Sequence, residues 1–398
     1  MVLFSVINVD LKLIANINPK ILFILILFLL TEIIAAKEPQ NWDNSLETTK
    51  KEIFIVENFT GGFDVPWGMA FLPNGKLLVS DRNGTLWLVD KNGEYKVKIT
   101  GVPKVRYKGQ GGLLDIQIHP NYKDNNFIYL SYSDFLKDNK NKSFTSIVRA
   151  RLDKNQMTDI ISIYKADNIF YTKSTVHYGT RIVFDNKGYL YFSIGDRGER
   201  KQAQLLTFPN GKIHRLHDDG SIPIDNPFVN QVAAIKSIWT YGNRNPQGLA
   251  INSKSSYLFE TEHGPKGGDE LNILKKGNNY GWPEITYGKN YTGTRITKFT
   301  HKEGMEQPVI HWTPSIAVCG IDFYDGKIFK NWENNLLVTS LKFENLYRLE
   351  ILDNKVLNQE MIYSAGSRIR DVETGPEGWI YLAVEDPGRI IRLKPSSK

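Results

Sequence analysis

"TRIVFDNKGYLYFSIGDRG", residues 180–198, contains two short apolar segments that are separated by a turn rich in Asp, Asn and Gly. The alternation of side chains along both segments, and the turn between them, are typical of antiparallel β-strands. The segment "GKIHRL", residues 211–216, continues the same composition after a polar stretch. This part of the chain therefore predicts one antiparallel unit of three or four strands.

The same pattern recurs along the chain. Six copies begin at Trp67, Leu113, Thr180, Gln247, Gly320 and Arg368. A strand unit repeated at intervals of tens of residues is typical of a β-propeller, in which each blade packs against its neighbours. We therefore predict an all-β, six-bladed propeller. The segment at 51–59 is expected to add an outer strand to the last blade, and insertions are expected at 133–146, 198–210 and 275–310 on the binding face.

Composition narrows the class of protein. The 398 residues are 41% hydrophobic and 12% aromatic, with a net charge of +7. No Lys/Arg run or arginine-rich helix forms a basic stripe, so we expect no nucleic-acid partner. The single cysteine, Cys319, excludes an internal disulfide and a cysteine-based zinc cluster. We assign it no catalytic role.

The N-terminal segment predicts export. Lys12 and Lys20 precede the apolar stretch "ILFILILFLL", and the small residues Ala35 and Ala36 follow it. This order is typical of a secretory signal peptide, and an uncleaved membrane anchor is the alternative. We therefore divide the chain into a signal or anchor (1–36), a linker (37–50) and the propeller (51–398). The propeller is expected to be periplasmic or secreted, with membrane contact only through an uncleaved N-terminal segment.

One loop is dense in oxygen ligands. The stretch at 259–284, "FETEHGPKGGDELNILKKGNNYGWPE", contains the acids Asp269 and Glu270. Turns at Gly264–Pro265 and around Tyr280 can expose backbone carbonyls. Calcium takes six to eight oxygen ligands from carboxylates and carbonyls. A calcium site and a solvated surface turn are both consistent with this loop.

Polar and cationic residues occupy equivalent positions in several repeats. They lie at or near the inner ends of separate blades and are Gln110, Arg244, Asn245, Lys342, Arg368 and Arg370. Equivalent positions of different blades line one central tunnel mouth. Four cations at such a mouth repel one another unless an anionic guest lies between them. Because arginine favours bidentate pairing with carboxylates, we predict a ligand that carries several carboxylates.

Six motifs in register resemble a known family. They are "GQGGLLDI", "HYGTRIVFD…YFSIGDRG", "GNRNPQGL", "EHGPKGGDELN", "NNYGWP" and "RIRDV". In this order they resemble the soluble pyrroloquinoline-quinone (PQQ)-dependent sugar dehydrogenases, and the bacterial aldose sugar dehydrogenase branch more than the glucose dehydrogenase branch. The resemblance covers roughly residues 50–395. It implies a six-bladed propeller that holds PQQ and Ca²⁺, oxidises aldoses to lactones and passes electrons to an acceptor, which we do not identify.

The resemblance also implies roles for individual residues. His177 matches the general base that takes the proton of the anomeric hydroxyl. Cofactor contacts are implied for Gln110, Arg244, Asn245, Lys342, Arg368 and Arg370, and Tyr291 and Trp312 are candidates for the aromatic that flanks the cofactor. Gly264 and Pro265 match the carbonyls that hold the cofactor-bound calcium. Glu270 and the Tyr280 carbonyl match ligands of a second, structural calcium.

Two positions depart from the family pattern, and two other functions stay open. Thr180 replaces a small residue. Val176 replaces an acid found before the histidine in the glucose dehydrogenase branch, which predicts a less tightly paired base. A propeller is also compatible with a calcium-dependent lactonase or another hydrolase, or with a catalytically silent, secreted binding module.

Overall fold

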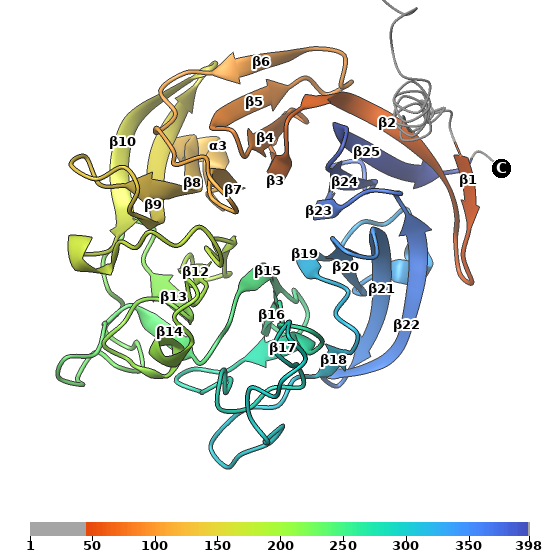
Figure 1. Ribbon diagram of the computed structural model, residues 1–398. Coiled ribbons are helices and arrows are strands. Elements are labelled where there is room, and N and C mark those ends of the chain that lie inside the picture. Colours follow the sequence, from red (N-terminus) through yellow and green to blue (C-terminus); the bar gives the residue numbers. More distant parts are fainter. Residues whose placement is uncertain (1–44, 397–398) are drawn as a thin grey trace, which may run out of the picture. The chain divides into compact units, whose positions relative to one another are not determined.

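The computed structural model describes residues 45–396, and within them six antiparallel sheets surround one axis (Figure 1). The prediction of a six-bladed, all-β propeller is confirmed. Blade 1 consists of β3 (Pro66–Phe71), β4 (Leu77–Asp81), β5 (Thr85–Val89) and β6 (Lys96–Ile99). Blade 2 consists of β7 (Leu113–Ile118), β8 (Phe127–Phe135), β9 (Ser143–Asp153) and β10 (Gln156–Lys165). Blade 3 consists of β11 (Ile182–Phe184), β12 (Leu190–Ile194), β13 (Lys212–Leu216) and β14 (Ile238–Tyr241).

The remaining blades follow in chain order. Blade 4 consists of β15 (Pro246–Ile251), β16 (Leu258–Glu262), β17 (Asp269–Leu274) and β18 (Ile310–Trp312). Blade 5 consists of β19 (Val318–Phe323), β20 (Leu336–Ser340), β21 (Asn345–Leu352) and β22 (Lys355–Ser364). Blade 6 contains β23 (Ile369–Thr374), β24 (Ile380–Val384) and β25 (Gly388–Pro395). Short helical turns occur at α3 (Tyr122–Asn125), η1 (Asn168–Phe170), η2 (Arg200–Gln204) and η3 (Lys330–Trp332).

The two ends of the described chain close the ring in one sheet. The N-terminal strand β2 (Ile53–Phe63) pairs antiparallel with β25, with Val56 opposite Leu393. The outer strand expected from residues 51–59 is therefore confirmed (Figure 1). A fifth strand, β1 (Ser45–Thr48), pairs with β2. The sheet thus begins inside the stretch expected to be a linker (37–50), because residues 45–48 gain ladder hydrogen bonds there.

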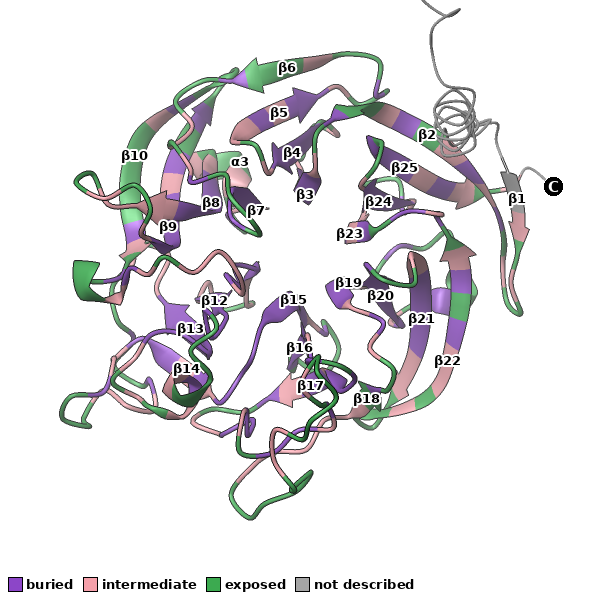
Figure 2. Ribbon diagram, viewed as in Figure 1, coloured by how far each residue is buried: buried purple, intermediate pink, exposed green. Residues whose placement is uncertain are grey.

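Apolar side chains fill the spaces between neighbouring blades. Leu78 of blade 1 belongs to the same buried cluster as Ile116 and Ile128 of blade 2. The inner strands are buried on both faces, so β4 has no exposed residue, whereas outer strands such as β10 are largely exposed (Figure 2). Each fully buried Leu or Ile contributes about 1.5–3 kcal/mol through the hydrophobic effect. This packing fixes the inner strands around the axis.

Two of the three expected insertions are present as expected. Loops extend through residues 198–210, which include η2, and through most of 275–310, between β17 and β18. The third is shorter than the expected 133–146, because β8 continues to Phe135 and β9 begins at Ser143. Within residues 45–396, no helix is long and apolar enough to cross a membrane. The predicted signal or anchor (1–36) lies outside the described residues.

Candidate active site

A cavity of about 520 Å³ lies on the propeller axis, and every blade contributes to its lining. It is lined by residues at the inner ends of the blades, among them Trp67, Gln110, Gly179, Asn245, Lys342 and Arg368. Five of the predicted cofactor contacts therefore meet at one place, namely Gln110, Asn245, Lys342, Arg368 and Arg370. The size suits a small-molecule ligand.

Four cationic side chains line this cavity. They are Arg82, Lys342, Arg368 and Arg370, and two carboxylates, Glu344 and Glu385, accompany them. Burial alone opposes the charge of Arg370, but its ion pair with Glu385 raises the pKa of the guanidinium above its ordinary value. The distance from Arg370 Nε to Glu385 Oε1 is 2.9 Å. The lining thus has more cations than carboxylates, as the sequence predicted.

Arg82 is a member of this set that the sequence reasoning missed. It lies in the turn between β4 and β5, and its Nη1 donates a hydrogen bond to the carbonyl of Gly109. Its Nε is buried and has no hydrogen-bond partner among the described residues. A buried donor without a hydrogen-bond partner is unfavourable, so a ligand that accepts a hydrogen bond from it would bind more tightly. The sequence signal that could have identified Arg82 is its place in the "DRNG" turn, which follows an inner strand of blade 1.

The structure does not bring Arg244 into the axial cavity. Its Nη1 instead donates to the carbonyls of His263 and Gly264, each at 2.9 Å. Its backbone N–H donates to the carboxylate of Glu262. Arg244 therefore lies beside the axial cavity rather than in its lining, because its guanidinium donates to these two carbonyl oxygens.

His177 is not itself a lining residue of the axial cavity, but its chain neighbours Tyr178 and Gly179 are. Two polar contacts hold His177 in this position. Its backbone N–H donates to Gln110 Oε1 at 2.6 Å, and its Nδ1 lies 2.6 Å from Asp196 Oδ1. The Asp196 carboxylate also accepts from Trp282 Nε1 and from the Gly198 N–H, each at 2.8 Å. With Nδ1 protonated toward Asp196, Nε2 keeps its lone pair. The weaker pairing that we predicted from Val176 is wrong, because Asp196 supplies the acid from the neighbouring strand end.

The pKa values of this pair favour a neutral imidazole. Burial lowers the pKa of His177 below its ordinary value of 6.5, and Asp196 opposes this only in part. Burial also disfavours the charge on Asp196, but the hydrogen bond from His177 holds the pKa of that carboxyl below its ordinary value. His177 can therefore accept a proton near neutral pH.

The turn that carries His177 has an unusual backbone. His177, Gly179 and Thr180 have positive φ angles of 52°, 68° and 92°. A β-branched residue rarely adopts such an angle, and strained turns of this kind cluster at functional sites. A Cβ on Gly195 would lie 2.5 Å from the carbonyl oxygen of His177. Only glycine at 195 lets the strand end of Asp196 approach His177 so closely.

A second group of polar residues surrounds a small cavity beside Arg244. Glu262 and Glu270 face each other across β16 and β17 and line this cavity together with Gly264 and Tyr280. Asn272 Nδ2 donates to Glu260 at 3.1 Å and to Glu270 at 3.3 Å, and Glu260 Oε1 is buried without a partner among the described residues. Burial raises the pKa of Glu270 to about 7 and the pKa values of Glu260 and Glu262 well above the ordinary range.

These acids are the residues best suited to a cation. Within residues 45–396, no group of three or more His, Cys, Asp or Glu side chains could hold a metal ion by itself, so backbone oxygens would have to complete the site. Asp269, expected to supply a carboxylate, accepts instead from the Gly264 N–H at 2.9 Å and from Ser315 Oγ at 2.8 Å. It orders the loop around Gly264. The Pro265 carbonyl oxygen lies 3.4 Å from Ser315 Oγ, whose one hydrogen serves the shorter contact with Asp269.

Neither aromatic candidate reaches the cavity. Tyr291 is 73% exposed in the long loop between β17 and β18, and it is absent from the lining. Trp312 is buried in β18, where its Nε1 donates to Gln359 at 2.9 Å. The structure places Trp67 and Tyr178 in the lining instead. Spacing along the sequence does not fix which aromatic side chain of a strand or loop faces the axis, so it did not single out these two residues.

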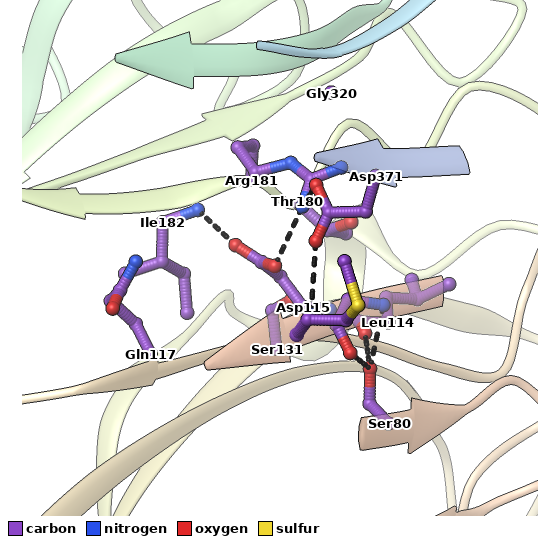
Figure 3. A network of polar contacts seen from close by, with 12 residues as sticks. Ser80, Leu114, Asp115, Gln117, Ser131, Thr180, Arg181, Ile182, Gly320 and Asp371 are labelled. Atoms are coloured by element: carbon purple, nitrogen blue, oxygen red, sulfur yellow. Dashed lines mark hydrogen bonds and ion pairs between the residues drawn. The ribbon is translucent and has the colours of Figure 1, made fainter. Parts of the chain in front are cut away.

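A buried ion network ties the blades together around the axis (Figure 3). Arg181 of blade 3 lies between Asp115 of blade 2 and Asp371 of blade 6, at 2.9 Å and 2.7 Å. Its guanidinium also lies 4.6 Å from the ring centre of Trp67, and its Nη2 donates to the Arg370 carbonyl at 3.5 Å. The network holds three blades in register next to the cavity. The sequence signal was the acid that recurs in the inner strands, in "LLDI" and "IRDV".

Comparison with known proteins identifies the family. Residues 63–392 match the model of the glucose/sorbosone dehydrogenase family. The aldose sugar dehydrogenase YliI of Escherichia coli (strain K12) is 40% identical over 85% of this chain and 92% of its own length.

Solved structures agree with this match. The soluble aldose sugar dehydrogenase from Escherichia coli in its apo form is similar at TM-score 0.81 and 39% identity, over 86% of this chain and 99% of its own. The PQQ-bound aldose sugar dehydrogenase of Streptomyces coelicolor is similar at TM-score 0.70 and 26% identity, over 89% and 98%. On these matches, which span the propeller, the chain belongs to the glucose/sorbosone dehydrogenase family of sugar oxidoreductases.

Proposed function

We propose that this chain oxidises aldose sugars at the anomeric carbon to lactones with PQQ as the cofactor. The observation that carries the proposal is the axial cavity, where Arg82, Lys342, Arg368 and Arg370 gather beside the His177–Asp196 pair. Family membership makes the chain a sugar oxidoreductase; the cofactor, the position of attack and the residue roles are the proposal. Electrons then pass to an acceptor outside the sugar site.

The cavity residues fit a planar polycarboxylate such as PQQ. Arg82 Nε and His263 Nε2 are buried without partners among the described residues, and both residues line the cavity. Lys342 and Arg368 are exposed to the cavity and form no ion pair that would compete for a ligand carboxylate among residues 45–396. Together with Gln110 and Asn245, these groups would hold the cofactor. When bound, PQQ supplies the quinone carbonyl that accepts the hydride from C1.

His177 is proposed as the general base. Its Nε2 takes the proton of the C1 hydroxyl, so that the C1–O bond gains double-bond character as the hydride leaves C1. Asp196 keeps its hydrogen bond to Nδ1, which fixes the ring and stabilises the imidazolium that forms. Positioned general-base catalysis of this kind contributes about 10²–10⁴-fold in rate. Gln110 fixes the backbone of the base through the 2.6 Å contact with the His177 N–H.

Calcium is proposed at two places. The acids around the small cavity have raised pKa values, and among the described residues that line it Arg244 is the one cation. These features fit a divalent cation held by Glu270, the Tyr280 carbonyl and Glu262. The carbonyls of Gly264 and Pro265 would hold the cofactor-bound calcium. The Gly264 carbonyl accepts one hydrogen bond, from Arg244, and keeps a second lone pair. The Pro265 carbonyl is also free to bind a cation, because the one hydrogen of the nearby Ser315 hydroxyl serves the shorter contact with Asp269. Calcium acts as a Lewis acid on oxygens that it contacts.

The alternative functions have less support. A calcium-dependent lactonase would place several carboxylates around an axial metal, whereas the axial lining contains Glu344 and Glu385, and Glu385 is paired with Arg370. A silent binding module needs no base whose ring is fixed by a buried acid. Location outside the cytoplasm stays a proposal, because it rests on residues 1–36.

Reconstitution tests the proposed function. The purified chain is titrated with PQQ and Ca²⁺, and aldoses are added with an artificial electron acceptor. We expect that the acceptor is bleached only when sugar is present, that bleaching requires both PQQ and Ca²⁺, and that the product is a lactone. Lactone hydrolysis without PQQ would support the lactonase instead. Absence of any turnover by a correctly folded, PQQ-loaded protein would refute the dehydrogenase.

A further inference from the structure

A second cavity, of about 380 Å³, opens between blades 2 and 3. It is bounded by the segment that follows β10 and by the loop that contains η2. Aromatic rings form part of its wall, and Phe170 and Phe208 meet edge to face with their centroids 5.8 Å apart. None of the residues discussed for the axial cavity lines this one, so it is a separate site.

The second cavity shares a wall with the candidate base. Arg197, which follows Asp196, lines it and donates to the carbonyls of Ser174, at 2.8 Å, and Val176. Asn210 also lines it and donates to the Asp196 carbonyl at 2.9 Å. A single layer of side chains thus separates this cavity from the segment that carries His177.

The charge in this wall is not balanced. Lys142, Lys173 and Arg197 line the cavity, and Glu199 is the one acid among the described lining residues. None of the three cations forms an ion pair within residues 45–396. Arg197 is 1% exposed, and its Nε has no hydrogen-bond partner in the described chain. The Arg197 guanidinium lies 3.4 Å from the centroid of the Tyr178 ring, so it adds positive charge from within the wall. Lys142 and Lys173 lie beside aromatic rings without ion pairs among the described residues, which suits a planar anion, because such an anion can stack on a ring and pair with a cation.

We propose that this second cavity binds the electron acceptor, and that the acceptor is a planar, conjugated anion of the quinone or quinone-imine class. The inference rests on the proposed function, because an enzyme that oxidises a sugar needs an acceptor. The aldose loses its C1 hydrogen and its hydroxyl proton, which amounts to two electrons and two protons. The acceptor gains the same two electrons and two protons, so that the overall reaction balances.

A second sugar ring is the competing occupant. Aromatic walls also stack against neutral sugars, but a neutral ring gains only hydrogen bonds from these cations, whereas an anion also gains charge neutralisation. The two occupants therefore predict opposite effects of charge. Reversing the charge of Lys142 and Lys173 should weaken the binding of an anionic acceptor much more than the binding of a neutral disaccharide.

Direct binding tests the inference without turnover. The probe is 2,6-dichlorophenolindophenol, a planar anion. Its binding is measured by equilibrium dialysis against the chain without sugar, with saturating PQQ and Ca²⁺ present so that the cationic axial cavity is occupied. We expect the dissociation constant to rise by about tenfold or more in Lys142→Glu/Lys173→Glu and in Phe170→Ala. Lys91→Glu, on an exposed turn between β5 and β6, is the matched control and should bind like the wild type. Unchanged binding in both cavity variants, with intact thermal unfolding, would overturn the inference.

Turnover provides the second arm. With PQQ and Ca²⁺ present, the same variants should raise the KM for this dye, leave the KM for glucose unchanged and not raise the KM for cationic phenazine methosulfate. A raised KM for maltose with an unchanged KM for the dye would make the cavity a sugar subsite and would overturn the inference. Dye binding is measured without catalysis, so loss of dye affinity in the variants stands even if no sugar is oxidised, and the two failures are distinguishable.

Discussion

Asp196 Oδ1 lies 2.6 Å from His177 Nδ1, although the two residues are 19 positions apart in the chain. The contact forms because Gly195 directly follows the end of β12, and only glycine there allows the approach to the His177 carbonyl. Trp282, from the long loop of blade 4, donates to the other oxygen of Asp196. The ring of His177, the proposed base, is thus oriented by contacts from separate segments of the chain.

Asp196→Asn is expected to lower kcat by about 10²–10³-fold while the affinity for PQQ changes little. An amide cannot favour protonation at Nδ1 or stabilise the imidazolium. Trp282→Phe, which removes one donor to Asp196, should have a smaller effect in the same direction. Steady-state kinetics of both variants with one aldose measures this. Equal losses in the two variants would mean that Asp196 acts only through packing.

The pH profile should reflect a depressed histidine pKa. Burial lowers the pKa of His177 below its ordinary value of 6.5. The imidazole therefore stays neutral, and able to act as a base, at pH 6.5. We expect kcat to stay level from pH 8 down to 6.5 and to fall only at lower pH. Asp196 raises this pKa, so Asp196→Asn should move the acid limb to still lower pH. A wild-type limb centred above pH 7 would contradict this assignment of the base.

Calcium binding should depend on Glu270 and on pH. Burial raises the pKa of Glu270 to about 7, from an ordinary value of 4.5. Its protonation therefore favours the calcium-free fold, whose stability should rise as pH falls from about 7 toward 4.5. Added Ca²⁺ should raise Tm more at pH 8 than at pH 6, because protons compete with the metal.

Glu270→Gln is the variant that tests the site, and Glu303→Gln, at an exposed position of the same long loop region, is its control. Differential scanning calorimetry with and without Ca²⁺ should show most of the Tm increase lost in Glu270→Gln and kept in Glu303→Gln. An equal increase in both variants would place the cation elsewhere.

The buried network around Arg181 should matter for stability. Asp371→Asn leaves the buried guanidinium with one of its two acids, and we expect the free energy of unfolding to fall by up to about 3 kcal/mol. Glu333→Gln breaks the exposed pair with Lys254, whose atoms lie 3.4 Å apart, and should change stability by less than about 0.5 kcal/mol. Denaturant unfolding at pH 8 compares the two. A loss no larger in Asp371→Asn than in Glu333→Gln would show that the network does not tie the blades.

The sequence predicted most of the fold because each repeat carries its own strand and turn signals. Gly188 and Gly75, for example, both have positive φ in the turn between the first two strands of a blade. Ring closure by β2 was also predictable. The sequence indicates a strand before the first repeat that has no partner of its own, and the last repeat lacks an outer strand. The outer strand β1 was missed, because the four residues "SLET" carry no strand pattern that stands apart from a linker.

The candidate site was predicted in part. Gln110, Lys342 and Arg368 occupy equivalent repeat positions, so symmetry brings them together. Arg82 and Arg244 were exchanged because the direction of an arginine depends on its neighbours in space. The Arg244 guanidinium donates to the carbonyls of His263 and Gly264, whereas Arg82 reaches the axial cavity from a turn. Long-range contacts of this kind have no signature in local spacing.

The most direct test is to measure the binding of PQQ to the apo protein in the presence of Ca²⁺, with fluorescence or calorimetry as the readout. The account predicts tight binding that weakens by about 10–100-fold in Arg82→Ala and in Lys342→Ala, since each removes a charge-assisted hydrogen bond. Lys187→Ala, on an exposed turn of blade 3, should bind like the wild type. Equal affinity in all four proteins, or no binding in the wild type, would contradict the claim that cations around the axis hold a polycarboxylate cofactor.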